Sequence, residues 1–231
     1  MTSRALDDAL GRARDANTSR HRDAVRVLQI MHHAGKRMTG RAARTAGVVT
    51  IIKSEKKLNA LDFWMRYPDY LVNELLTMYE DNPIQNERLL EEAIKAFEGT
   101  EPELRWLAML RNWFGAYGAL DDAIAILVHL GLVKFHRDLH RDGVRVKERS
   151  YHLLQRGADL AIELAEHEPL SWYSERAKLV AVVAQNESGN QLKARQHKIA
   201  TYHNARHGDI IEPIREIVAE RLQAVRRRAA R

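Results

Sequence analysis

One stretch of the sequence, from Leu132 to Leu160, constrains the fold more than any other. It follows an apolar segment, Leu120–Leu130, that we expect to form a helix ending at Gly131. A strand is predicted over Val133–Leu139, and the Arg-Asp-Gly sequence shortly after it favours a tight turn, because an Asp-Gly pair tolerates the positive φ angles of such turns. The chain is therefore predicted to reverse direction here as a hairpin.

The second arm of the hairpin is predicted over Val144–Leu154, and a helix is predicted over Gln155–Glu166. The order helix, strand, hairpin loop, strand is that of the second half of a winged helix, in which the hairpin loop is called the wing. We therefore expect a mainly α-helical protein with a small antiparallel β-hairpin, built as a winged-helix core with flanking helices. Winged helices either bind nucleic acid or serve as docking modules in larger assemblies, so the individual residues must distinguish these roles.

Hydrophobic periodicity and capping residues predict helices in the rest of the chain. A β-branched run at 48–52 fits either a short strand or part of a helix, and Ser54 is a suitable N-cap for the helix after it. We divide the chain into an N-terminal helical region (1–99), a winged-helix region (100–168) and a C-terminal helical extension with a basic tail (169–231). Further helices are predicted over residues 22–34, 55–66, 69–80, 84–97, 101–114, 170–184, 190–205 and 210–229.

Composition bounds the class of protein and its compartment. The chain has 231 residues, of which 45% are hydrophobic, and it contains no cysteine, which excludes disulfides and thiolate metal sites. No run approaches the roughly 18 apolar residues of a membrane span, and the first residues lack the apolar centre of a signal peptide. We therefore expect a cytoplasmic protein that makes no contact with a membrane.

Charge is distributed unevenly along the chain. Residues 1–57 hold 13 basic and 5 acidic residues (net +8), residues 58–131 hold 5 and 13 (net −8), and residues 132–231 hold 19 and 13 (net +6). A chain segmented in this way can approach an anionic polymer with some of its faces and must keep another face away from it. Solvated helix faces explain the same charge runs equally well.

Motifs for enzymatic chemistry are missing from the sequence. It contains no GxxxxGK[ST] phosphate loop and no GxSxG, HExxH or GxGxxG motif, so we expect no catalytic residue and no cofactor. The one spacing that suits a metal is the pair His203 and His207, four residues apart in a predicted helix. Because no further ligands are apparent, two exposed helix histidines are the preferred interpretation, and no metal site is expected.

The helix before the hairpin lacks the chemistry to read base edges. Its sequence, LDDAIAILVHL, offers only Asp121, Asp122 and His129 as polar groups, and carboxylates repel phosphates. The hairpin itself is basic and could bind phosphates without reading sequence, although solvated edge-strand charges are an alternative interpretation. The candidate nucleic-acid contacts are Arg137, Arg141, Arg145, Lys147 and Arg149.

A second dense segment, KLNALDFWMRYPDYLVNELL, concentrates aromatic residues beside an arginine. Aromatic residues with arginine are typical of anchors in protein interfaces, although core packing explains most of them too. The candidate interface residues in this segment and in a later helix are Phe63, Trp64, Arg66, Tyr67, Tyr70, Trp172 and Arg176.

Three segments together resemble the middle-component proteins of bacterial ABC-ATPase three-component systems, of which the SMC-associated, Lamassu-like defence systems are an example. They are LDFWMRYPDYL, the helix and wing LGLVKF…SYHLLQRGADLA, and WYSERA starting at Trp172. This resemblance covers residues 22 to about 184 and implies a non-enzymatic winged-helix adaptor that bridges an SMC-like ABC ATPase and an effector in an antiphage or anti-plasmid complex. It leaves the basic C-terminal helices unexplained; these helices could pair on the core or on another chain, as in a homodimer. The alternatives are a winged-helix transcription regulator, a non-specific DNA-binding protein or, through His203 and His207, a metal-dependent enzyme.

Overall fold

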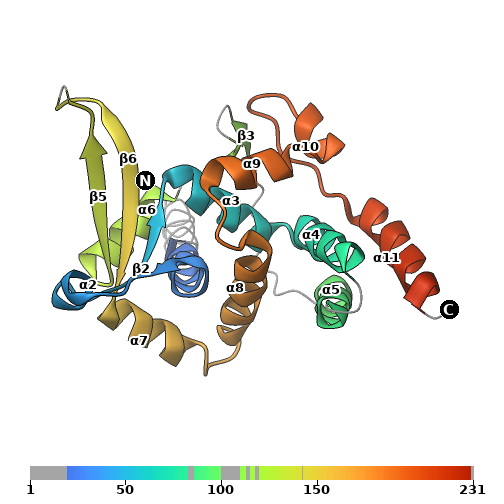
Figure 1. Cartoon of the computed structure of the whole chain (residues 1–231), viewed down its shortest axis with the longest axis horizontal. Helices are drawn as coiled ribbons and strands as arrows, with labels where there is room; N and C mark the ends of the chain where they lie inside the picture. Colours follow the sequence, from blue (N-terminus) through green and yellow to red (C-terminus); the bar gives the residue numbers. More distant parts are fainter. Residues whose placement is uncertain are drawn as a thin grey trace, which may run out of the picture.

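The computed structural model describes residues 20–82, 86–99, 110–112, 115–117, 120–141 and 143–229 of the chain. The described part is mainly helical and contains a small four-stranded antiparallel sheet, so the general fold class predicted from the sequence is confirmed. Figure 1 shows a long hairpin that projects from one end of the molecule, with the C-terminal helix at the opposite end.

The sheet is larger than the predicted hairpin because two N-terminal strands join it. Its order is β1 (Lys36–Arg37), β2 (Val48–Lys53), β6 (Val146–Leu154) and β5 (Val133–Leu139), and every neighbouring pair is antiparallel. The β-branched run at 48–52, whose sequence fitted either a strand or a helix, is therefore a strand. Its inner position between β1 and β6 gives it hydrogen-bond partners along both of its edges.

The hairpin closely follows the sequence prediction. Strand β5 has the predicted bounds, and β6 begins two residues later than predicted. Gly143 adopts a φ of 68°, which an Asp-Gly turn supplies without strain. The tip is closed by the amide of His140, which donates to the carbonyl of Arg145 at 2.8 Å.

Helices pack against this sheet from both halves of the chain. The first spans residues 20–34, and α3 (Glu55–Arg66) starts at Ser54, whose hydroxyl accepts from the Lys57 amide at 3.2 Å as predicted for an N-cap. Tyr67 leaves helical geometry before Pro68, so a new helix begins there. The other helices up to residue 166 are α2 (Arg41–Thr45), α4 (Pro68–Asp81), α5 (Glu87–Glu98), α6 (Asp121–His129) and α7 (Gln155–Leu164).

The C-terminal extension contains more breaks than predicted. The helix predicted over 190–205 is divided into α9 (Gly189–Gln196) and α10 (Ala200–Asn204), with Ile199 in extended geometry between them. The last helix, α11 (Arg215–Ala229), begins five residues later than predicted, because Pro213 disfavours helical geometry in the residue before it. Helix α8 (Ser171–Ala184) agrees with its prediction to within one residue.

The helix predicted over 101–114 is wrong where the structure describes it. Residues Leu110–Asn112 form strand β3, which pairs with β4 (Gly115–Tyr117) in a separate two-stranded sheet. Local periodicity favoured a helix there, and pairing across a short connection overrides it. The capping box predicted at Thr100–Glu103 lies outside the described residues.

The regions predicted at 1–99, 100–168 and 169–231 do not divide the structure into separate units. Strand β2 from the first region pairs with β6 from the second. A single hydrophobic core also draws on all three regions, with buried residues such as Val27, Trp64, Leu153 and Val218. The hydrophobic core is therefore complete only when the N-terminal and C-terminal segments pack together with the hairpin region.

Candidate nucleic-acid interface

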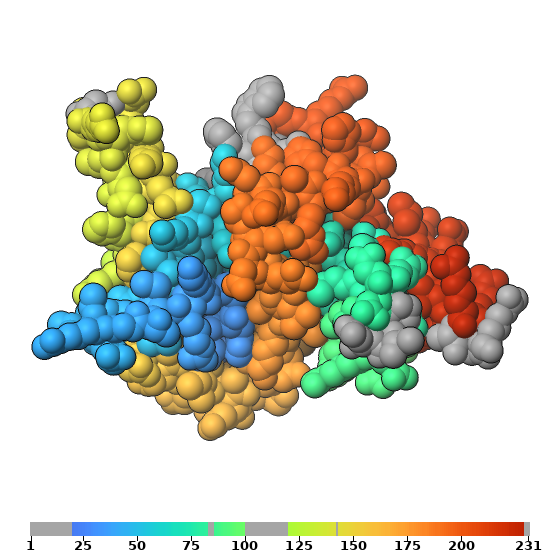
Figure 2. All heavy atoms as spheres, viewed as in Figure 1, coloured from blue at the N-terminus to red at the C-terminus, as the bar shows by residue number. Residues whose placement is uncertain are grey.

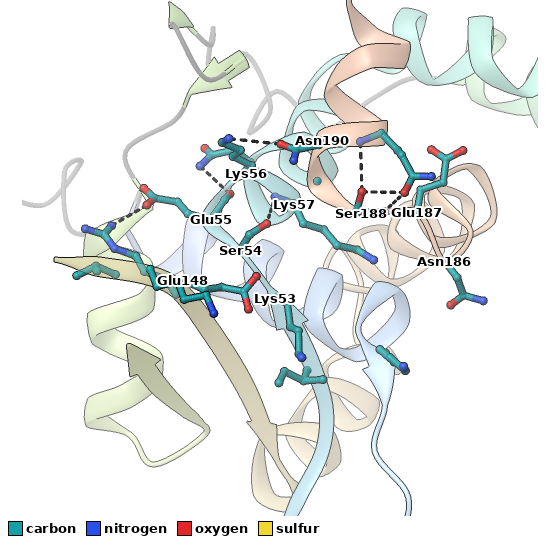
Figure 3. Close-up of a pocket in the computed structure, with 18 of the residues that line it drawn as sticks. Lys53, Ser54, Glu55, Lys56, Lys57, Glu148, Asn186, Glu187, Ser188 and Asn190 are labelled. Carbon is teal, nitrogen blue, oxygen red and sulfur yellow. Dashed lines mark hydrogen bonds and ion pairs between the residues drawn. The ribbon is translucent and has the colours of Figure 1, made fainter. Parts of the chain in front are cut away.

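A groove runs between the hairpin and α9, with the end of β2 and the start of α3 at its floor (Figure 2). Lysine is its commonest lining residue, and Figure 3 shows several lysine side chains reaching into it. The acidic residues at its lining are Glu55, Asp121, Glu148 and Glu187. The basic residues that line the groove are Lys36, Lys53, Lys56, Lys57, Lys147 and Arg149.

Two helix N-termini meet in this groove. Ser54 caps α3, and Ser188 caps α9 through a capping box with Gln191. They come this close because position 189 is glycine: a Cβ atom there would lie 2.7 Å from the Lys57 amide nitrogen and 2.9 Å from the Ser54 hydroxyl. Both helix dipoles therefore add positive potential to a groove that is already rich in lysine.

Two of the four groove carboxylates are held by arginine. Glu55 forms an ion pair with Arg149 at 2.7 Å, and Glu187 forms one with Arg195 at 3.1 Å. Within the described part of the chain, Lys36, Lys53 and Lys147 are exposed and form no ion pair. Burial lowers the pKa of Lys57, and Glu187 acts against that shift. The groove thus keeps an excess of positive charge.

A second, smaller hollow lies at the tip of the hairpin and shares one lining residue with the groove. Its lining includes Arg141 and Arg145 together with Lys147, which also lines the groove. Arg149 lies further along β6 in its ion pair with Glu55, and Arg137 stacks over the Phe135 ring at 5.1 Å. The structure therefore brings three of the five predicted contact residues together at the tip and places the other two nearer the body of the protein.

Helix α6, which precedes the hairpin, carries no basic residue other than His129. Asp121 and Asp122 are exposed at its N-terminus, and Val128 and Leu130 are 40% and 47% exposed at its other end. The solvent face of α6 is thus acidic and apolar. A helix with this surface lacks the donors that bind guanine or adenine edges in the major groove.

The aromatic segment proposed as an interface is buried in the core. Phe63, Trp64 and Tyr70 are completely inaccessible to solvent, and Tyr67 is nearly so. Phe63 stacks with Tyr67 at a ring distance of 4.7 Å and meets Tyr202 of α10 edge to face at 5.3 Å. In this conformation these side chains are not available to a partner, which corrects the interface prediction in favour of core packing.

Arg66, another interface candidate, belongs to a buried ion-pair network. Its Nε lies 2.7 Å from Asp62, and Arg26 binds the same carboxylate at 2.5 Å. Although burial alone would raise the pKa of Asp62, the two guanidinium groups hold it below its usual value. The network satisfies charges inside the fold and leaves Arg66 unavailable to a partner.

The remaining interface candidates lie on α8. Arg176 is buried, and its guanidinium stacks over the half-buried Trp172 ring at 5.1 Å. Burial lowers the pKa of Arg176 to about 10. This pair therefore contributes mainly to packing inside the chain, and only the partly exposed edge of Trp172 reaches the surface.

His203 and His207 do not share a helix. Helix α10 ends at Asn204, so the spacing that suggested a metal pair is not maintained by a regular turn. Among the described residues, no three histidine, aspartate or glutamate side chains are grouped closely enough to bind a metal ion. The same part of the chain contains no helix with the length and apolar character needed to cross a membrane.

Sequence reasoning missed most of the groove. Lys36, Lys53, Lys56 and Lys57 flank β2 and the start of α3, and their sequence neighbourhood is basic, but nothing local shows that they face the hairpin. Their proximity to Gly189, more than 130 residues away, depends on tertiary structure.

Comparison of the chain with protein-family models, curated proteins and solved structures finds no match.

Proposed function

We propose that this chain is a non-enzymatic winged-helix protein that binds the phosphate backbone of DNA through its hairpin and the adjoining groove. The observation that carries the proposal is that Lys147 lines both hollows, so basic residues follow one another from the groove to the hairpin tip. We use the name basic track for Lys36, Lys53, Lys57, Lys147, Arg145 and Arg141.

The order of elements supports a winged-helix core. The 20–34 helix, strand β2, helix α3, helix α6 and the β5–β6 hairpin occur in the order of that fold, and β2 lies beside β6, the second hairpin strand. Strand β1 and helix α2 lie between the first helix and β2. Helices α4 and α5 and residues 99–119 are then an insertion between the two central helices. In this interpretation α6 has the position of the reading helix and the hairpin is the wing.

The proposed binding is independent of sequence. The acidic and apolar face of α6 offers nothing to base edges, whereas lysine and arginine side chains on the basic track suit phosphate oxygens. Such binding releases counterions, so the affinity should fall steeply as salt rises, by about 0.9 logarithmic units per logarithmic unit of salt for each phosphate contact.

Fluorescence anisotropy with a labelled random-sequence duplex, at ~50 and ~200 mM salt, tests this proposal. The triple variant Arg141→Ala, Arg145→Ala, Lys147→Ala should bind more weakly, and its salt slope should be smaller by about three contacts. Lys95→Ala on α5, which removes an exposed charge far from the hairpin in Figure 1, is the control and should leave the slope unchanged. Absence of binding by the wild type at ~50 mM salt would refute the proposal.

A second candidate function is an adaptor role beside an SMC-like ABC ATPase and an effector, as the sequence resemblance implies. The surface of α6 favours it, because exposed Val128 and Leu130 at one end of the helix and two carboxylates at the other suit a protein partner better than a phosphate backbone. Burying these two side chains in an interface would remove them from water without desolvating a cation.

Co-purification with the products of neighbouring genes tests the adaptor role. Association that is lost in Val128→Ser, Leu130→Ser and retained in the hairpin triple variant would separate the two surfaces. A protein that purifies alone and stable, with no ATPase partner, would count against this role while leaving DNA binding unaffected.

A further inference from the structure

The groove wall opposite the sheet contains a carboxylate that would compete with any bound phosphate. Glu187 lies in the loop before α9, and its charge already stabilises the charged form of Lys57 on the basic track. A carboxylate turned toward Lys57 would neutralise that cation. In the structure Glu187 points away from Lys57 (Figure 3), so some other group must hold it there.

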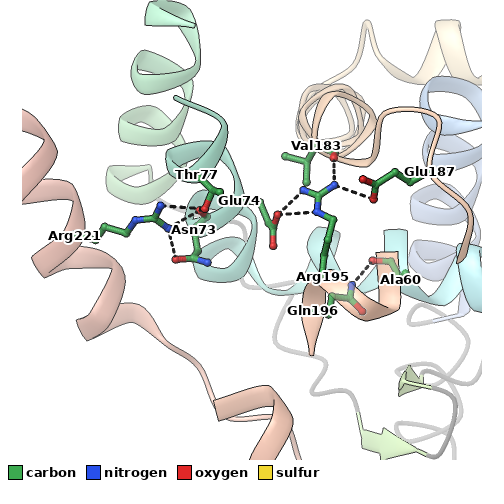
Figure 4. Close-up of polar contacts among 9 residues, drawn as sticks. All are labelled: Ala60, Asn73, Glu74, Thr77, Val183, Glu187, Arg195, Gln196 and Arg221. Atoms are coloured by element: carbon green, nitrogen blue, oxygen red, sulfur yellow. Dashed lines mark hydrogen bonds and ion pairs between the residues drawn. The ribbon is translucent and has the colours of Figure 1, made fainter. Parts of the chain in front are cut away.

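That group is Arg195 of α9, which binds three partners at once. One terminal nitrogen of its guanidinium donates to the Val183 carbonyl at 2.8 Å and to Glu187 at 3.1 Å. The other terminal nitrogen and Nε both donate to the same oxygen of Glu74 on α4, the latter at 3.2 Å. Figure 4 shows Arg195 between the two glutamates, so it joins the groove wall to the core helix α4.

The surroundings of Arg195 make this arrangement rigid. Its side chain is 19% exposed and that of Glu74 only 9%, and the guanidinium lies 5.4 Å from the centre of the Trp64 ring. Burial alone would lower the pKa of Arg195, and the two glutamates raise it, so the group stays charged. The next residue, Gln196, donates to the Ala60 carbonyl of α3 at 3.1 Å.

We infer that Arg195 is a positioning residue of the basic groove, which ties the loop before α9 to α4 and keeps the Glu187 carboxylate away from Lys57, so that the groove remains open to phosphate. This inference rests on the proposed DNA binding and adds a residue that touches no DNA itself. Arg195 acts through Glu187. When Arg195 is removed, the Glu187 carboxylate should pair with Lys57 and so compete with a DNA phosphate for that cation.

The experiment compares four forms of the full chain in the duplex-binding assay: wild type, Arg195→Ala, Glu187→Gln and the double variant. Arg195→Ala should bind more weakly at ~50 mM salt, and its salt slope should be smaller by about 0.9, the change expected when one cation of the track is neutralised. Adding Glu187→Gln should restore most of that loss, because the neutral amide cannot pair with Lys57. Glu163→Gln, an exposed change of equal charge on α7, should restore nothing.

A loss in Arg195→Ala that persists in the double variant would overturn the inference, because it would show that the Glu187 charge is not what weakens binding. If Arg195→Ala is not folded by circular dichroism, the same comparison is made in Arg195→Lys, which keeps a charge against Glu74 but lacks the planar guanidinium whose separate nitrogens reach Glu74 on one side and Glu187 on the other.

An NMR titration of Lys57 separates failure of this inference from failure of the proposed function. With Glu187 released, the pKa of Lys57 should rise toward its ordinary value in Arg195→Ala, and it should not rise in the double variant. This measurement needs no DNA, so a wild type that fails to bind the duplex refutes the proposed function only. An unchanged pKa of Lys57 in Arg195→Ala would refute the inference about Arg195.

Discussion

Two groups of basic residues in this chain have opposite environments. Arg26, Arg195, Arg221 and Arg226 are bound to carboxylates of other helices, so they neutralise part of the acidic middle of the sequence through ion pairs within the chain. The exposed lysines Lys36, Lys53 and Lys147 form no ion pair among the described residues. The comparison shows that net charge along the sequence does not reveal which cations remain available to a partner.

The arginines also explain the charge segmentation. Arg221 binds Glu80 of α4 at 2.5 Å, and Arg226 binds Glu98 of α5 at the same distance, so the basic C-terminal helix covers part of the acidic region. The basic end of α11 lies at the opposite end of the molecule from the hairpin (Figure 1). We therefore do not include it in the proposed DNA-binding surface, although its sequence is as basic as the hairpin.

The largest effect on the free energy of unfolding is expected from breaking the most buried ion pairs, those of Asp62. Asp62→Asn removes the buried carboxylate that Arg26 and Arg66 share and should lower the free energy of unfolding by about 3–5 kcal/mol, measured by urea denaturation. Asp122→Asn, which breaks the exposed pair with Arg20, should change it by less than about 1 kcal/mol. Equal effects in the two variants would contradict the contrast between buried and exposed cations.

The pH dependence of stability follows from the same carboxylate. The folded-state pKa of Asp62 lies below its unfolded value of about 3.9, so its contribution is complete above that value and is lost as the pH falls through the folded pKa. Unfolding measured between pH 2 and 5 should therefore show a steeper loss of stability in the wild type than in Asp62→Asn.

A smaller effect on stability is expected from disturbing the close packing of α9 against α3 at Gly189. Gly189→Ala places a Cβ atom against the backbone of Lys57 and should destabilise the fold by about 1–3 kcal/mol while weakening duplex binding. Asn190→Ala, at the exposed neighbouring position, should change stability by no more than about 0.5 kcal/mol. A Gly189→Ala protein with unchanged stability would show that α9 can move away from α3 at little cost.

The smallest effect on stability is expected from the cations of the basic track. Lys53→Ala should leave the free energy of unfolding within about 0.5 kcal/mol and should weaken duplex binding. Arg221→Ala should show the reverse, with a stability loss of about 1 kcal/mol or less and unchanged affinity for the duplex. Both variants losing affinity equally would mean that the two groups of cations are not functionally distinct.

Part of the fold could be predicted because its signals are local. The hairpin follows from an Asp-Gly turn between two strand-like segments, and the break at Tyr67 follows from Pro68. The short β3–β4 pair was missed because periodicity over 101–114 favours a helix, while the strand depends on pairing with Gly115–Tyr117. The interface prediction for the aromatic segment failed for a related reason: Tyr202, which completes the cluster with Phe63, comes from a distant helix.

The sequence by itself determined the local elements: a basic hairpin, an acidic and apolar helix before it, and amphipathic helices around them. Tertiary structure alone decided which charges remain exposed, because an ion pair such as Arg195 with Glu74 joins residues far apart in the chain. It also decided that the lysines near Ser54 face the hairpin across a groove, since the close approach depends on Gly189 packing against Lys57. Backbone propensity acts over a few residues, whereas charge neutralisation and groove formation depend on distances in the folded chain.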